Sequence, residues 1–349
     1  MHRQISTSHE NKSRLVDLFA RTISYLRLSL TDRCNLRCLY CDPEDEELPS
    51  HLPKLAHCEM LSYEELLRIV GVAVGMGISK VRLTGGEPLV RSNVIDFIRA
   101  MGKIEGLTDV RLTTNGVLLE QYAEDLFQAG VTKVNISLDT LKPERFKRIT
   151  GVDCFDKVWR GVLKALEVGF SPVKVNVVTM RNVNDDELKD FIRLAKKLPL
   201  QIRFIEFMPI GDATRWSTNT YISCDEIKER LVAFEKLVPL DRKETDGPAQ
   251  VYRLGTGSQG SIGFISPMSH KFCDRCNRLR LTSAGTLRAC LLYDQETDLK
   301  NIIRNGASDE DIRQTLIAAI LNKPKGHEMA ELINTPANSC HGQMSRIGG

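Results

Sequence analysis

Apolar and polar residues alternate in six short runs within about the first 210 residues, and amphipathic segments lie between these runs. The alternating runs predict strands at 25–29, 80–84, 109–115, 132–138, 173–179 and 201–207. The amphipathic segments predict helices near 62–76, 92–102, 118–129, 155–168 and 184–198. This succession of strand-then-helix units implies an α/β protein whose parallel sheet is wound either as a barrel or as a doubly wound sheet.

The two faces of the predicted strands differ in character. One face is apolar, as in Leu26/Leu28 and Val81/Leu83, and would be covered by the helices. The opposite face is polar and basic, and consists of Arg27, Ser29, Lys80, Arg82, Thr84, Arg111, Thr113, Asn115, Lys133, Asn135, Ser137, Lys174 and Asn176. A doubly wound sheet is covered on both faces and would be apolar throughout, so the pattern favours a barrel, or part of one, with a wet basic lumen.

A basic lumen of this kind suits a phosphorylated substrate. The alternative is a sheet edge protected by Lys and Arg, which explains less well why five strands agree. The sixth strand does not follow the pattern, because Arg203 and Glu206 lie at opposite parity.

The strand-then-helix rhythm stops beyond about residue 215. A helix is expected at 224–237, then short Gly-rich strands around 250–266, a loop that carries cysteines, and a last helix near 308–322. We therefore predict an N-terminal arm over 1–20, a partial barrel over 21–215 and a C-terminal domain over 216–349.

Charge and hydropathy exclude several classes of protein. The 349 residues include 48 basic and 45 acidic ones, and a net charge of +3 argues against a general nucleic-acid or membrane-surface binder. The longest apolar run, 69–78, is broken by three glycines and is too short for a bilayer, and the N-terminus lacks the apolar region of a signal peptide. We expect a cytoplasmic enzyme, in which ten cysteines favour metal binding over disulfides.

Three of the cysteines, Cys34, Cys38 and Cys41, form a Cx3Cx2C array directly after the first strand. Three thiolates this close can ligate three irons of a cubane cluster and leave the fourth iron open to a small molecule. A zinc site would need a fourth ligand, for which His51, His57 and Cys58 are available. The array also lies where a βα loop leaves a barrel strand, and active sites of barrels are built from these loops.

A second array consists of Cys273, Cys276 and Cys290. Taken alone, this spacing is as compatible with a zinc ribbon completed by His270 as with an iron–sulfur site. Arg278 and Arg280 lie two residues apart on an extended run, so both would point the same way as phosphate-binding forks.

Together these motifs resemble the radical S-adenosylmethionine enzymes. The Cx3Cx2C array with an aromatic residue before its last cysteine resembles the signature of that family, and Gly85-Gly86-Glu87-Pro88 resembles its second motif. The stretches 81–91, 113–116, 137–141, 203–209 and 262–291 are similar, in this order, to the branch that cyclises GTP at the start of molybdenum cofactor synthesis. The resemblance implies an incomplete (β/α)6 TIM-like barrel with a C-terminal iron–sulfur domain that closes the barrel mouth.

The resemblance also implies cofactors and site residues. Cys34, Cys38 and Cys41 would hold one 4Fe–4S cluster, and Cys273, Cys276 and Cys290 a second one whose open iron meets the guanine base. S-adenosylmethionine would be bound by Tyr40, Gly86, Ser137 and Met208. GTP would be bound by Arg27, Arg82, Thr113, Lys174, Arg278, Leu279 and Arg280, with Lys80 and Arg203 as further contacts.

The chain ends Gly348-Gly349, and composition alone favours a disordered tail. The family carries a similar terminus that reaches into the active site, and we expect the same here. Two departures from the family pattern are Asp42, where methionine is usual, and Asn182, where glycine is usual.

The resemblance further implies GTP as substrate, an external electron donor and, as partner, the next enzyme of molybdopterin synthesis, cyclic pyranopterin monophosphate synthase. It is compatible with a homodimer. Two alternatives remain at this point. One is a radical S-adenosylmethionine enzyme that matures peptides, although such enzymes generally carry more C-terminal cysteines. The other is a zinc-binding, non-enzymatic nucleic-acid module, for which the near-neutral charge offers no basic stripe.

Overall fold

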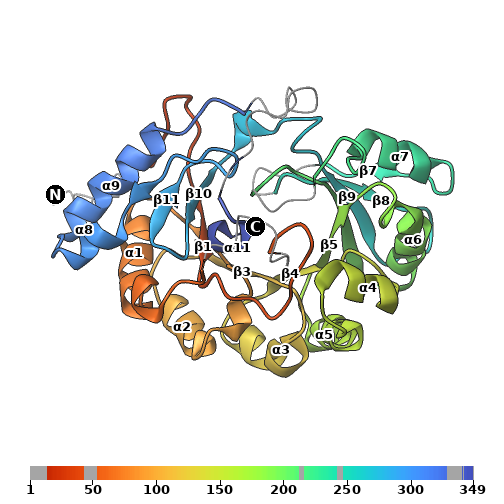
Figure 1. The fold of residues 1–349 in the computed structure, drawn as a ribbon, viewed down its shortest axis with the longest axis horizontal. Helices are drawn as coiled ribbons and strands as arrows, with labels where there is room; N and C mark the ends of the chain where they lie inside the picture. The colour runs from red at the N-terminus through yellow and green to blue at the C-terminus, as the bar shows by residue number, and fades with distance from the viewer. Residues whose placement is uncertain are drawn as a thin grey trace, which may run out of the picture.

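A computed structural model describes residues 14–42, 53–211, 216–241, 247–327, 340 and 342–348. Its centre is a sheet of six parallel strands, each joined to the next by helical crossovers that lie outside the sheet (Figure 1). The strands are β1 (Tyr25–Ser29), β2 (Lys80–Thr84), β3 (Asp109–Thr114), β4 (Lys133–Ser137), β5 (Val173–Thr179) and β6 (Leu200–Glu206). The helices are α1 (Tyr63–Gly75), α2 (Val94–Met101), α3 (Leu119–Gln128), α4 (Pro143–Thr150), α5 (Phe155–Val168) and α6 (Leu188–Lys197).

These elements confirm the predicted strand-then-helix units. α1 begins as its sequence indicates, because Ser62 Oγ accepts from Glu65 N and the Glu65 carboxylate accepts from Ser62 N. The segment predicted at 184–198 starts as a 3-10 turn over Asp185–Glu187, so the α-helix begins only at Leu188. α4 was not predicted, because its eight residues carry only two large apolar side chains that turn inward, Phe146 and Ile149.

The C-terminal part extends the sheet at both edges. β9 (Ser261–Ile265) pairs in parallel with β6, and β10 (Arg278–Leu281) pairs in parallel with β1. Antiparallel strands continue outward: β8 (Gln250–Arg253) and β7 (Val238–Pro239) beyond β9, and β11 (Thr286–Arg288) and β12 (Thr297–Asp298) beyond β10. The incomplete barrel is therefore confirmed, and the C-terminal part lies along its open side.

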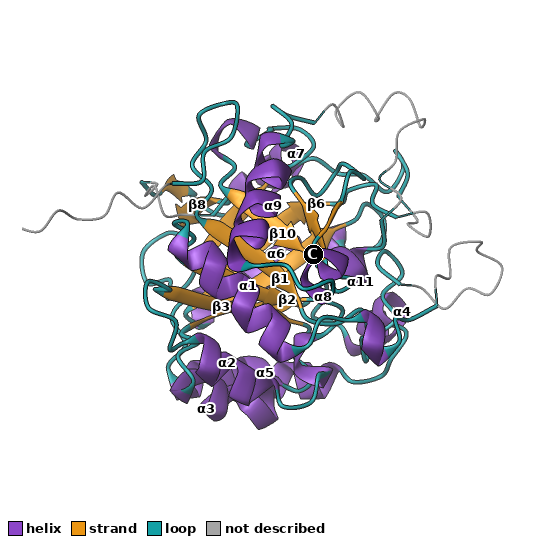
Figure 2. Ribbon diagram, turned by 90° about the vertical axis from the view of Figure 1, so that its left-hand side faces the viewer, coloured by secondary structure: helices purple, strands orange, loops and turns teal. Residues whose placement is uncertain are grey.

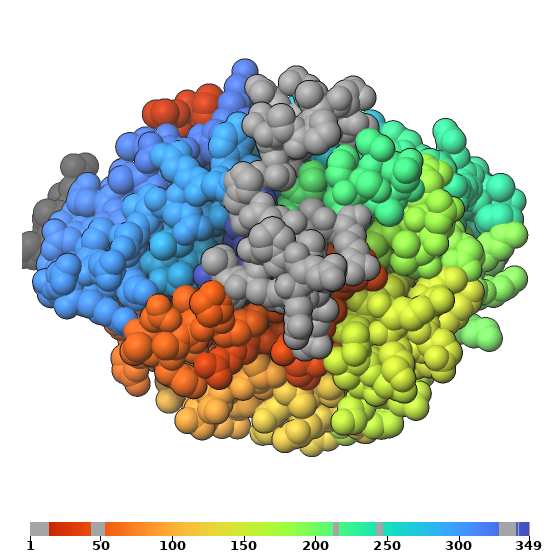
Figure 3. Space-filling model, in the orientation of Figure 1, coloured from red at the N-terminus to blue at the C-terminus, as the bar shows by residue number. Residues whose placement is uncertain are grey.

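The C-terminal helices are α7 (Cys224–Val232), α8 (Lys300–Arg304), α9 (Asp309–Leu321) and α11 (Met344–Ile347). α7 is five residues shorter than the predicted 224–237, and the chain then runs on towards β7. α8 and α9 lie beside α1 (Figure 3). There Arg304 Nε pairs with Glu65 Oε1 and Arg68 Nε with Asp309 Oδ1, both at 2.8 Å. These ion pairs attach the C-terminal part to the barrel wall.

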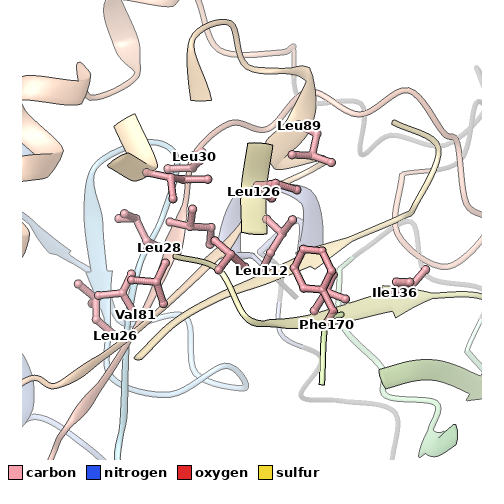
Figure 4. Packing of buried hydrophobic residues seen from close by; sticks show 14 of the residues in the cluster. Leu26, Leu28, Leu30, Val81, Leu89, Leu112, Leu126, Ile136 and Phe170 are labelled. Carbon is pink, nitrogen blue, oxygen red and sulfur yellow. The ribbon is translucent and has the colours of Figure 1, made fainter. Parts of the chain in front are cut away.

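The predicted apolar faces form the core between strands and helices. Leu26, Leu28, Val81, Leu112 and Ile136 are buried there (Figure 4). Figure 2 shows the strands in the interior with α1, α2 and α3 outside them. Burial of this face forces the alternate side chains of every strand into the lumen.

Among the described residues, no helix is long and apolar enough to span a membrane. The last part of the predicted N-terminal arm is packed, since Leu15 is buried and Val16 forms an antiparallel bridge with Thr22. Asp17 accepts from Arg21 Nε at 2.5 Å, which holds this turn together.

Candidate active site

Strand register collects the basic side chains of the lumen into layers. Arg280, Arg27, Arg82 and Arg111 occupy matching positions on the neighbouring strands β10, β1, β2 and β3. Lys174 of β5 lies at the level of Asn135 and Gln201, and Arg203 of β6 at the level of Asn176. The predicted basic lumen is thus confirmed, and Arg82, Arg111, Arg203 and Arg280 are all more than nine-tenths buried.

Burial and the crowding of cations lower the pKa of Lys174 and of Arg280. Burial, followed by the nearby charges of Arg203, Arg111 and Arg82, lowers the pKa of Lys174 to about 6. Burial and Arg278 lower the pKa of Arg280 to about 10. Asp109, at the start of β3, accepts from Arg111 Nε at 2.8 Å and lies 3.9 Å from Lys80 Nζ. The lumen cations that do not pair with Asp109 would be stabilised by a polyanionic ligand.

Three polar side-chain atoms of the lumen are also available to bind a ligand. Ser29 Oγ, Asn135 Oδ1 and Asn176 Oδ1 are buried, and none has a hydrogen-bond partner among the described residues. A buried polar group without a partner costs free energy, so these three atoms fit a pocket that binds a ligand with many hydrogen-bonding groups.

The first cysteine array follows the carboxyl end of β1. Cys34 Sγ accepts from Leu36 N at 3.4 Å and from Asn115 Nδ2 at 3.6 Å. Burial raises the pKa of Cys34, Cys38 and Cys41, and the neighbouring thiolates raise those of Cys38 and Cys41 further. Such a pocket fits a metal group whose positive charge stabilises the thiolates.

The part of the chain that the structure describes contains no three His, Cys, Asp or Glu side chains that converge on one metal ion. Each array supplies three cysteines, and in a cubane each cysteine ligates a different iron. His270 is also directed elsewhere, since its Nε2 lies 2.6 Å from Asp225 Oδ2. His51 lies outside the described residues.

The loop after β2 packs tightly against the loop that leads to Cys34. Gly86 N donates to Thr31 O at 2.7 Å, and a Cβ at Gly86 would lie 2.3 Å from Arg33 O. Only glycine permits this approach. Glu87 is fully buried and accepts from Leu89 N, Thr114 Oγ1 and Asn115 N, while burial raises its pKa to about 7. The two motifs therefore form one structural unit.

The other residues expected to bind S-adenosylmethionine are Tyr40 in the first cysteine array, Ser137 at the end of β4 and Met208 after β6. Tyr40 Oη donates to Asp139 Oδ2 at 2.6 Å, and its ring meets Phe207 edge to face. Asp139 follows Ser137 in the loop after β4, and burial raises its pKa to about 6. Met208 packs instead against the C-terminal segment, near Cys340 and Ile347.

The sequence placed Asn115 on the lumen face but did not predict its contact with Cys34, and it did not single out Asp139, which accepts from Tyr40; both lie within the matching stretches 113–116 and 137–141. Polar side chains directly after strand ends were the signal that could have identified them.

The second array lies at the opposite end of the lumen. Cys276 comes two residues before Arg278, which pairs with Tyr25 at the beginning of β1, whereas Cys34 follows the end of β1. Burial raises the pKa of Cys276, but Arg278 and Lys323 outweigh it and lower the pKa overall. Arg21 Nη1 donates to Cys273 O at 2.9 Å, and Lys323 Nζ to Arg278 O at 2.8 Å. Cationic side chains thus anchor the loop and favour the thiolate of Cys276, whereas burial raises the pKa of Cys273.

Three of the arginines expected to bind GTP contact neighbouring side chains. Arg82 Nη1 reaches Thr113 Oγ1 at 3.3 Å, Arg203 Nε donates to Gln201 Oε1 at 3.0 Å, and Arg278 lies over the ring of Phe272. Leu279 places its side chain in the hydrophobic core, so only its backbone could contact a ligand in the lumen.

Gly348 lies in the lumen. Arg280 Nη1 donates to Gly348 O at 2.5 Å. A Cβ at Gly348 would lie 2.2 Å from Thr84 Oγ1, and its φ of 80° favours glycine. Gly349 lies outside the described residues. The expected approach of the tail to the site therefore holds for Gly348.

The two departures from the family pattern are tolerated. Asp42 forms an ion pair with Lys54. Asn182 adopts a φ of 60°, a left-handed conformation that asparagine shares with glycine more readily than other residues do. Neither change removes a cysteine or a lumen cation.

Comparison with known proteins agrees with this geometry. The Radical SAM superfamily model matches residues 28–195, and the model described as Molybdenum Cofactor Synthesis C matches residues 200–329. A GTP 3′,8-cyclase of Thermodesulfovibrio yellowstonii is 51% identical over 311 residues, which cover 89% of this chain and 94% of the relative. A GTP 3′,8-cyclase of Moorella thermoacetica is 47% identical over 333 residues, covering 95% and 99%.

Solved structures share the fold at much lower identity. Streptococcus suis SuiB bound to S-adenosylmethionine superimposes with a TM-score of 0.58 at 14% identity, over 94% of this chain and 77% of that chain. Native anSMEcpe with bound AdoMet gives a TM-score of 0.56 at 17% identity, over 88% and 83%. At these identities the similarity shows the fold alone.

Proposed function

The chain belongs to the GTP 3′,8-cyclase family of radical S-adenosylmethionine enzymes, and from this premise we propose which of its residues carry the reaction. It is a lyase that converts GTP to (8S)-3′,8-cyclo-7,8-dihydroguanosine 5′-triphosphate, the first step of molybdenum cofactor biosynthesis. Its cofactors are S-adenosylmethionine and two 4Fe–4S clusters, and its substrate is GTP.

The proposed ligands of the two clusters are the two cysteine arrays. Cys34, Cys38 and Cys41 hold the first cluster, beside which Tyr40, Gly86, Ser137 and Met208 bind S-adenosylmethionine. Cys273, Cys276 and Cys290 hold the second cluster. When bound, the first cluster and S-adenosylmethionine supply the electron and the 5′-deoxyadenosyl radical that removes the 3′ hydrogen of GTP.

The chain itself contributes the position of the substrate. Arg27, Arg82, Lys174, Arg278 and Arg280 bind the triphosphate, with Thr113, the backbone of Leu279, Lys80 and Arg203 as further contacts. The alignment of Arg280, Arg27 and Arg82 across three paired strands, between the two cysteine arrays, is the observation that supports this assignment most strongly. Fixing the triphosphate would hold the ribose near the first array and the base near the second.

The C-terminal tail, which includes Gly348 and Gly349, completes the pocket in this proposal. Gly348 contacts Arg280 and lies close to Thr84 and Ser29 at the ends of β2 and β1. Two residues without side chains fit such a narrow site, and their presence excludes water from a reactive radical.

We further propose three units, namely the arm 1–20, the barrel 21–215 and the C-terminal domain 216–349. Support comes from the end of the strand-then-helix rhythm after β6. As partners we propose an external electron donor, a second copy of the chain and the next enzyme of the pathway, cyclic pyranopterin monophosphate synthase, which would receive a labile product. The cytoplasm is the proposed compartment, and the unpaired state of all ten cysteines is consistent with it.

Substitution of Cys290 tests the second array. After anaerobic reconstitution we expect about eight irons per chain in the wild type, falling toward about four in Cys290→Ser, which would also lose GTP cyclisation. Cys58→Ser is the matched control, because Cys58 is exposed and belongs to neither array. Full cyclisation by Cys290→Ser would refute the role of the second array.

A further inference from the structure

Tyr25 is a buried residue of the lumen to which the proposed function gives no task. It opens β1, where its register partners are Lys80 on β2 and Arg278 on β10. Only 9% of its surface is exposed, and Lys80 Nζ lies 5.5 Å from the centre of its ring. The side chain thus lies one layer away from Arg27, Arg82 and Arg280, toward the second cysteine array.

The phenol oxygen of Tyr25 is hydrogen-bonded to Arg82. Its Oη accepts from Arg82 Nε at 2.5 Å. Arg82 Nη1 is held on another side, at 3.3 Å from both Leu112 O and Thr113 Oγ1. Nη2 has no hydrogen-bond partner among the described residues, so these three contacts fix the plane of the guanidinium and leave one edge available to a ligand.

The charges around Tyr25 strengthen this contact. Burial alone raises the pKa of the phenol, but Arg82, Arg27 and Arg278 outweigh it and lower the pKa to about 7. Lys80, which faces the ring from β2, pairs in turn with Asp109 at 3.9 Å. An oxygen with phenolate character is a stronger acceptor for a guanidinium than a neutral hydroxyl is.

We propose that Tyr25 is a positioning residue that orients Arg82, so that the open edge of its guanidinium faces the triphosphate of GTP. This inference rests on the proposed function, because it takes Arg82 as a contact of the triphosphate. Tyr25 acts through Arg82 and not on the reacting carbons. Its loss therefore weakens the binding of GTP and leaves the chemical step nearly unchanged.

The test begins with Tyr25→Phe, which keeps the ring and removes only the oxygen. Equilibrium binding of GTP to the anaerobically reconstituted chain, with no reductant present, should weaken about tenfold, as expected for loss of one hydrogen bond to a charged group. In turnover the KM for GTP should rise by a similar factor while kcat stays within about twofold. The KM for S-adenosylmethionine should not change.

Tyr63→Phe is the matched control. Tyr63 also lies against an arginine, with Arg91 4.2 Å from the centre of its ring, but its hydroxyl donates to Ser92 O outside the lumen. This variant should bind GTP as the wild type does.

A double-mutant cycle identifies Arg82 as the intermediary. In an Arg82→Gln background, which binds GTP weakly, addition of Tyr25→Phe should cost no further affinity. The inference is overturned if Tyr25→Phe binds GTP as tightly as the wild type, or if the two substitutions are additive. Failure of the wild type itself to bind GTP would instead refute the proposed function, so the two failures are distinguishable.

Discussion

Lys174 is the lumen residue whose protonation should respond most to the substrate. Burial and the cations Arg203, Arg111, Arg82 and Lys133 hold its pKa at about 6, so at pH 8 the side chain is mostly neutral. A bound triphosphate raises this pKa because it supplies the missing negative charge. We predict that binding of GTP at pH 8 takes up a proton at Lys174, seen as a dependence of the calorimetric enthalpy on the ionisation enthalpy of the buffer.

Lys174→Met should reduce this proton uptake and weaken the binding of GTP. A buffer-independent enthalpy in the wild type, or an unchanged proton uptake in the variant, would contradict the assignment.

The lowered pKa of Lys174 also predicts that this residue destabilises the folded chain. The pKa of Lys174 is lower in the folded chain than its ordinary value of 10.5, so the folded state disfavours the proton. The penalty is therefore greatest below about pH 6 and disappears as the pH rises toward 10.5. Lys174→Met should raise the melting temperature at pH 7 by roughly 2 °C, and the gain should vanish near pH 10. A lower melting temperature at pH 7 would show that Lys174 is paired in the free protein.

Among the elements, the contact between the loops after β1 and β2 leaves no room for a larger side chain. A Cβ at Gly86 would lie 2.3 Å from the carbonyl oxygen of Arg33, and this backbone cannot move without displacing Cys34. We predict that Gly86→Ala loses S-adenosylmethionine binding and the first cluster, with iron falling from about eight toward about four per chain. Gly71→Ala is the control, because nothing lies within 4 Å of that position in α1 and the helix should gain about 0.5–1 kcal/mol.

The close packing of Gly348 in the lumen predicts that a larger residue there displaces the C-terminal tail. Gly348→Ala would bring a Cβ to 2.2 Å from Thr84 Oγ1 at a positive φ, so the tail should leave the lumen while both clusters remain. Turnover of GTP should fall at least tenfold, and trypsin should cleave after Arg346 faster than in the wild type, since that residue now lies 3.6 Å from Asp32. Unchanged proteolysis with unchanged turnover would mean that the tail does not form part of the pocket.

Alternation along β1 to β5 was enough to predict both the core and the basic lumen, because a period of two leaves each side chain only one face. Glu206 does not fit the polar face predicted for the sixth strand because its side chain does not face the lumen. It is buried and accepts from Cys224 N, Met268 N and Ser269 N. It holds the loop before the second array, a task that strand parity cannot reveal.

The C-terminal strands could not be assigned partners from the sequence. β10 and β1 lie some 250 residues apart in the chain. A strand of two to five residues is also too short for its sequence pattern to show which strand it pairs with. For the same reason the arginine layer of β10, β1 and β2 was only partly predicted. The fork of Arg278 and Arg280 was expected, but not its alignment with Arg27 and Arg82.

For the molecule as a whole, the parallel sheet determines where the two cysteine arrays lie. The first follows the end of β1. Cys273 and Cys276 precede β10, which runs parallel to β1, and Cys290 follows β11, which runs antiparallel to β10, so the arrays occupy opposite ends of one lumen. The cations lie between them, and this explains how a chain with a net charge of only +3 presents a strongly basic interior. A substrate bound by its phosphates in this lumen could meet one cluster at each end.

The most direct test of the account is anaerobic incubation of the reconstituted chain with GTP, S-adenosylmethionine and a strong reductant, followed by mass spectrometry of the nucleotides. We expect a cyclised guanine nucleotide with the mass of GTP and a release of 5′-deoxyadenosine that depends on GTP. Release of 5′-deoxyadenosine at the same rate without GTP, with no cyclised nucleotide, would contradict it.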